Sequence, residues 1–175
     1  MALSLDTLKS NLKAWLEDKT AYSSISDSMT AFIDAYEDYI LDCVDISGDD
    51  ILTYFKTNAL NILKTITNSD TATTASQKFE NAIIAFWNTA TFKLLTPPAG
   101  TITPEISAIV TTNIIPTTLA SALHTIFNAK SNSDTDTTKA NQIATVLDTS
   151  TKTIIVTCTG TLSGGGTLAV PGAIS

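Results

Sequence analysis

The chain has 175 residues, a formal net charge of −7, 31 threonines and no arginine. Its length suits one domain, or one domain with an appendage, that folds without disulfides or metals. Because arginine supplies most of the two-pronged contacts to phosphates and bases, its absence argues against a nucleic-acid-binding protein.

The acidic residues are concentrated near the N-terminus. The first 50 residues hold 11 acidic residues and 3 lysines, whereas the remaining 125 hold 6 and 7. The negative electrostatic field of these residues repels DNA and anionic lipid. Such a region suits either a solvent-exposed face or the binding of a basic partner protein, and we favour the solvent-exposed face. Residues 1–15 lack the basic start and the apolar core of a secretory signal, which predicts synthesis in the cytoplasm.

Four amphipathic helices are expected in the first half of the chain. Apolar residues recur at helical spacing in residues 4–19 and 24–43. A third helix is expected over residues 47–63, because it opens with a serine and an aspartate spaced like a capping box. The fourth is expected over residues 74–95 and is stopped by the two prolines that follow.

An uncharged run of 22 residues, from 106 to 127, is long enough to raise the possibility of a membrane-spanning helix. We reject that interpretation, because Pro116 interrupts the run and Asn113, His124 and five threonines dilute its hydrophobicity. Pro116 is instead expected to be the first residue of a helix. A polar loop and a short helix around residues 139–149 follow.

The pattern changes again near the C-terminus. Residues 151–162 are rich in β-branched side chains, no charge follows Lys152, and three glycines then interrupt the segment. We therefore predict a mainly α fold. A helical body would span residues 1–149, with a possible subdivision near 96–104, and a short C-terminal β hairpin or extended arm would span residues 150–175.

A weak internal repeat is visible at an offset of about 60 residues. Residues 81–91 align with residues 141–151 at four identical positions, and each segment leads into an apolar, β-capable stretch. A true duplication and a chance match both stay open at this point.

Candidate catalytic chemistry is sparse. His124 is the single histidine, and without a nucleophile-elbow motif we expect a packed imidazole rather than a general base. Cys43 and Cys158 belong to no metal-ligand spacing and are expected to be reduced, buried thiols. The glycines of residues 163–166 lack the lysine of a phosphate loop and fit a hinge. We therefore predict no catalytic residue and no cofactor, and we expect that the protein is not an enzyme.

Two acidic groups could attract a hard cation. They are Asp34, Asp38 and Asp42, and Asp45, Asp49 and Asp50. Neither group fits the twelve-residue calcium loop, because the glycine is misplaced and no glutamate closes it. A solvated helix face explains them better, so no metal site is predicted.

Residues 75–175 combine an Ala-Phe-Trp segment, a Thr-Pro-Pro-Ala-Gly break, an uncharged threonine-rich stretch and a C-terminus of small residues. This order resembles small virion structural proteins of tailed bacteriophages. The resemblance implies a non-enzymatic subunit, present in symmetric copies in the tail, baseplate, neck or capsid. It also implies copies of itself and other virion proteins as partners, no nucleic acid or membrane, and a location in the virion after synthesis in the host cytoplasm.

Two other classes of function stay open. Threonine-rich strands and glycine hinges also occur in cell-surface or secreted adhesion modules, although no export signal is visible. An enzyme of unrecognised type that binds a small ligand between helices is compatible with a helical body, but no motif supports it.

The uncharged tail after Lys152 predicts an assembly segment. Its threonines and glycines leave no apolar run of about 20 residues, which argues against a membrane anchor. A β-prone strand invites aggregation unless it is paired, and within the chain the sequence suggests only residues 167–175 as a partner. We therefore expect residues 150–175 to pack on a neighbouring subunit by strand addition or hairpin docking. The interface candidates are Thr153, Ile154, Ile155, Val156, Thr157, Leu162, Leu168 and Val170.

Overall fold

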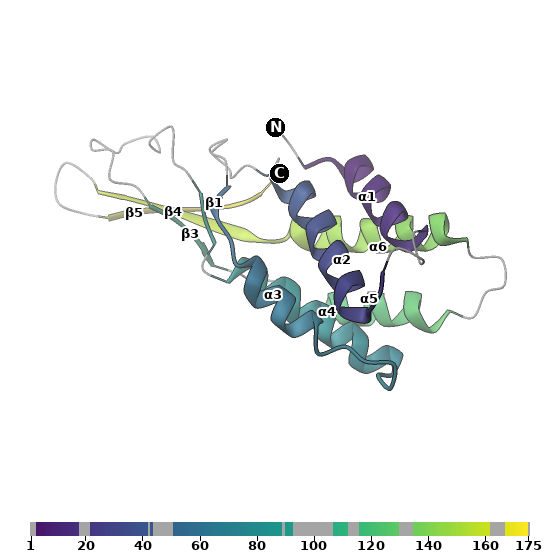
Figure 1. Cartoon of the computed structure of the whole chain (residues 1–175). Coiled ribbons are helices and arrows are strands. Elements are labelled where there is room, and N and C mark those ends of the chain that lie inside the picture. Colours follow the sequence, from purple (N-terminus) through teal and green to yellow (C-terminus); the bar gives the residue numbers. More distant parts are fainter. Residues whose placement is uncertain are drawn as a thin grey trace.

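A computed structural model describes residues 3–17, 22–41, 43, 51–88, 90–92, 107–111, 116–129, 135–161 and 167–174. The described residues are mainly helical, so the mainly α character predicted from the sequence is confirmed (Figure 1). The helices are α1 (Leu5–Glu17), α2 (Ile25–Ile40), α3 (Lys56–Leu63), α4 (Ala72–Trp87), α5 (Pro116–Asn128) and α6 (Asp136–Thr151).

The helices of the described residues form a closed cycle of contacts. Each helix packs against the next one along the chain, and α6 returns to pack against α1. The helical body therefore consists of three helical hairpins, α1–α2, α3–α4 and α5–α6, of which the first and the last also touch.

The second helix of each hairpin begins in the same way. Ser24, Thr71 and Thr135 are the N-cap residues of α2, α4 and α6, and each is in an extended conformation. Each side-chain oxygen accepts a hydrogen bond from the backbone N–H three residues later, at 3.1, 3.2 and 3.2 Å. Such a cap satisfies one of the donors left free at a helix start. All three helices then run for 16 residues.

The three second helices also share one hydrogen bond at their C-terminal ends. In each, a fully buried residue three positions beyond the helix donates its backbone N–H to the carbonyl of the last helical residue. The bonds are Cys43 to Ile40 at 2.9 Å, Ala90 to Trp87 at 3.0 Å and Ile154 to Thr151 at 3.0 Å. The hairpins are therefore structural repeats with common caps and common exits.

The sequence left a duplication at an offset of about 60 residues open, and the described elements recur at a different offset. The N-caps Thr71 and Thr135 set the offset between α4 and α6 at 64 residues rather than about 60. Four residues are close to one helical turn, so the alignment at about 60 residues still superposed apolar positions of the same helix face. The structure adds the α1–α2 hairpin to the repeat, which the sequence alignment missed.

Five antiparallel strands of the described residues form one sheet, which extends from one end of the helical body (Figure 1). The strands lie in chain order, β1-β2-β3-β4-β5. They are β1 (Ile51–Thr53), β2 (Thr91–Phe92), β3 (Ser107–Thr111), β4 (Ile155–Thr161) and β5 (Thr167–Ala173).

The sheet repeats the same offset as the helices. Thr91 of β2 pairs with Ile109 of β3, and Ile155 of β4 pairs with Ala173 of β5. Both partners of the second pair lie 64 residues after those of the first. The repeat therefore includes the strands that follow α4 and α6.

Two predicted helix boundaries were wrong. The segment expected to open a helix at residue 47 contains β1 instead, and α3 begins only at Lys56, after an N-cap residue without a side-chain cap bond. The helix expected to reach residue 95 ends at Trp87, because Asn88 turns into an extended conformation. β1 then pairs with β2, so pairing between distant segments overrides local helical periodicity.

The expectation that β4 could pair only with the C-terminal residues was also wrong. β4 pairs with β3 on one side and with β5 on the other, as two neighbours in a larger sheet. The uncharged run from residue 106 therefore supplies a strand before it supplies α5.

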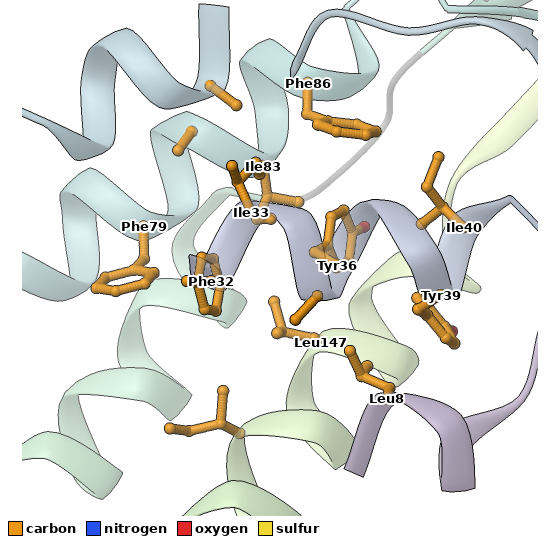
Figure 2. Packing of buried hydrophobic residues seen from close by; sticks show 14 of the residues in the cluster. Leu8, Phe32, Ile33, Tyr36, Tyr39, Ile40, Phe79, Ile83, Phe86 and Leu147 are labelled. Atoms are coloured by element: carbon orange, nitrogen blue, oxygen red, sulfur yellow. The ribbon is translucent and has the colours of Figure 1, made fainter. Parts of the chain in front are cut away.

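The core lies between the three hairpins and centres on α2 (Figure 2). Phe32 of α2 meets Phe79 of α4 edge to face, with ring centroids 4.8 Å apart. Tyr36 meets Phe86 in the same manner at 5.4 Å. Leu147 of α6 is buried in the same cluster. Full burial of one such side chain contributes about 1.5–3 kcal/mol to the stability of the fold. The buried residues of α2 therefore make a large apolar contribution to the packing of the helices.

Candidate functional site

A buried hydrogen-bond cluster joins the ends of the repeats. Trp87 and Thr151 are equivalent, as the last helical residues of α4 and α6, and both contact the hydroxyl of Tyr36. The indole Nε1–H of Trp87 donates to Tyr36 Oη at 2.7 Å, and the hydroxyls of Tyr36 and Thr151 lie 2.7 Å apart. Burial raises the pKa of the Tyr36 phenol, which keeps it protonated. The cluster is therefore a structural bond between helices rather than a source of acid or base.

A second polar group lies beside it. The Tyr39 hydroxyl donates to Asp148 Oδ1 at 2.6 Å, and Lys152 Nζ lies 2.9 Å from the same oxygen. Asp148 is 7% exposed, so its carboxylate is held by an internal donor and a surface ammonium. Burial and the bond to Asp148 raise the pKa of Tyr39. This group ties α2 to α6.

A polar pocket lies between α4 and α5, where the second repeat meets the third. It has a volume of about 370 Å³ and is lined mainly by hydroxyl, amide and ionisable side chains. Glu80 is 6% exposed and accepts a hydrogen bond from the Ala120 backbone N–H at 2.7 Å. Burial raises the pKa of the Glu80 carboxyl. The pocket could hold a small polar molecule against a buried acid.

His124 lines the same pocket, opposite Glu80 on α5. Its ring Nδ1 lies 3.3 Å from the Thr73 hydroxyl of α4. The structure therefore places the single histidine in the same pocket as a buried carboxyl, which the sequence did not indicate. A threonine hydroxyl and a single buried carboxyl provide a binding environment, but the contacts of His124 do not form a nucleophile–base–acid series.

One member of the acidic group Asp34, Asp38 and Asp42 forms an ion pair. Lys56 of α3 binds Asp34 at 2.7 Å and also pairs with Glu37. Burial opposes the charge of Lys56, but these hydrogen bonds raise its pKa. The candidates Asp42, Asp45, Asp49 and Asp50 lie outside the described residues.

Within the described ranges, no group of three or more acidic, histidine or cysteine side chains is arranged to hold a metal ion. None of the helices in the part of the chain that the structure describes has the length and apolar character needed to cross a bilayer. Cys43 is buried, as expected.

The predicted interface residues fall into different environments. Ile154 is fully buried in the core. Thr153 is exposed, and its hydroxyl donates to the Ser150 carbonyl at 2.7 Å. Ile155, Val156 and Thr157 belong to β4, and Leu168 and Val170 belong to β5. Leu162 lies outside the described residues.

No protein-family model, curated protein or solved structure matches the chain. The sequence reasoning missed Glu80, because a glutamate inside an amphipathic helix is normally solvent-exposed. The available signal was its position: it lies one residue after Phe79, on the same inward face as Ile83.

Proposed function

We propose that the protein is a non-enzymatic structural subunit of a tailed-bacteriophage virion, present in several symmetric copies. The order of segments over residues 75–175 supports this proposal, because it resembles small virion structural proteins. The arrangement of the molecule is compatible with such a role: a closed helical body carries a sheet at one end.

The C-terminal strands β4 and β5 form the proposed assembly segment. Their residues combine high β propensity with the absence of charge. Ile154 and Ile174 anchor the two strands in the core, since they are 0% and 3% exposed and the Ile174 N–H bonds the Ile154 carbonyl at 3.4 Å. The segment therefore continues from a fixed base, which suits docking of the hairpin better than exchange of a loose arm.

Particle incorporation tests this function. Mass spectrometry of purified virions should detect the protein at a fixed copy number. Leu168→Lys with Val170→Lys should reduce incorporation at least tenfold, whereas Ala169→Lys should not, because successive strand residues face opposite sides. Circular dichroism of the purified variants should show unchanged helix content.

Two outcomes would contradict the proposal. Normal incorporation of the Leu168/Val170 variant would remove the assembly role of β5. Absence of the protein from virions, together with its release into the medium without lysis, would favour the adhesion module.

A further inference from the structure

The three second helices allow the position of Glu80 to be compared with the equivalent positions in the other two repeats. Nine residues after each N-cap, the second helices carry Ile33, Glu80 and Ala144, and all three are buried. The same structural position therefore accepts apolar side chains in two repeats. The hairpin fold does not require a carboxyl group there.

Burial of the Glu80 side chain is energetically unfavourable. Burying a carboxylate is unfavourable unless hydrogen bonds or charges compensate for the lost water. Among the described residues, its carboxylate accepts a hydrogen bond from the Ala120 backbone N–H, in the second turn of α5. Equivalent positions of the repeats normally bury apolar side chains. A buried ionisable side chain in one repeat only, beside a concave site, is typical of functional positions.

The pocket beside Glu80 defines what it could bind. The described side chains that line it include one acid and no lysine, and His124 is the other ionisable group among them. A buried carboxylate in a lysine-free pocket favours a cationic ligand. The lining also includes the hydroxyl side chains of Thr73 and Ser121 and the amide of Gln77.

The volume limits the size of the ligand. Small-molecule sites usually span about 300–1,000 Å³, and this pocket has about 370 Å³. A single small molecule fits this volume. The ligand should carry one positive charge for Glu80 and several hydroxyls for the remaining lining.

We propose that the pocket between α4 and α5 binds a small hydroxylated ammonium compound, of the amino-sugar class, through Glu80. This site is independent of the assembly segment and does not rest on the virion role. The ammonium group would lie at the Glu80 carboxylate, and its hydroxyls would contact the polar side chains on the two helices.

The test compares two sugars that differ in one group. D-glucosamine is an ammonium compound at pH 6, and D-glucose is its neutral counterpart. Titration of the full-length protein, followed by the NMR shift of the Ala120 amide, should give at least tenfold tighter binding of glucosamine. Glu80→Gln should abolish that preference, because it keeps an acceptor for Ala120 but loses the charge. Glu17→Gln, an exposed substitution of the same kind on α1, should leave the preference unchanged.

A second variant separates ligand binding from the hydrogen bond between Glu80 and Ala120. Ser121→Leu fills the pocket without touching Glu80 and should block binding while the melting temperature stays near that of the original protein. Equal binding of both sugars overturns the proposal. So does an undiminished glucosamine preference in folded Glu80→Gln or, if that variant does not fold, in Ser121→Leu.

Discussion

The hairpins α3–α4 and α5–α6 have the same backbone frame and different interiors. Their second helices share N-caps, length and exit bonds, yet the last helical residue is Trp87 in one and Thr151 in the other. Both side chains reach the same Tyr36 hydroxyl. Short-range hydrogen bonds thus define the repeat, while the packing against α2 decides which side chain each repeat carries.

The largest expected difference between the two hairpins lies at this shared position. Trp87→Ala should lower the free energy of unfolding by about 3–5 kcal/mol, because it empties a large buried volume. Thr151→Ala should cost only about 1–2 kcal/mol, since it removes one hydroxyl contact and one methyl group. Urea denaturation of both variants measures the difference. Equal losses would mean that the two hairpins are packed alike.

The Tyr36 hydroxyl should couple the two repeats. Tyr36→Phe should lower the free energy of unfolding by about 1–3 kcal/mol, because the buried Trp87 N–H and Thr151 hydroxyl lose their partner. Adding Thr151→Val should cost less in this background than alone, because the unpaired hydroxyl is removed as well. Strict additivity of the two losses in a double-mutant cycle would contradict a shared bond.

The N-caps of α4 and α6 should contribute equally to the stability of the fold. Thr71→Ala and Thr135→Ala should each lower the free energy of unfolding by about 1 kcal/mol, because each removes the acceptor for one free backbone donor. Thermal unfolding of the two variants should give similar shifts. Thr71→Ser and Thr135→Ser serve as controls that retain the acceptor, and a large effect at only one cap would show that the repeats differ in their frame.

The smallest expected effect concerns the loop between α3 and α4. Hydrogen bonds from Lys78 and from the Thr67 N–H lower the pKa of Asp70 to about 2. A lowered carboxyl pKa stabilises the fold above the unfolded value of about 3.9, and the benefit is lost as the pH falls towards 2. The melting temperature of Asp70→Asn should therefore lie below that of the original protein at pH 7 and converge with it near pH 2. Lys78→Gln should weaken this pH dependence, and an unchanged dependence would exclude the ion pair as its cause.

The helical frame could largely be predicted from the sequence, because periodicity and caps are local signals. The spacing of apolar residues predicted the positions of α1, α2, α4 and α5. The N-caps Thr71 and Thr135 were also present in the sequence, but their repetition was not recognised. The strands β1 and β2 could not be predicted in this way, since three and two residues form a strand only through distant partners. The pocket was also invisible, because it depends on α4 and α5 lying side by side.

The return of α6 to α1 constrains how the chain can fold during synthesis. The contact joins residues more than 100 positions apart, and closing such long loops slows folding. When only the first two hairpins have emerged from the ribosome, the cycle of helix contacts is incomplete. The face of α1 that later packs against α6 is then still exposed. Such an intermediate exposes apolar surface to other chains. Cooperative folding should therefore complete only after the third hairpin has emerged.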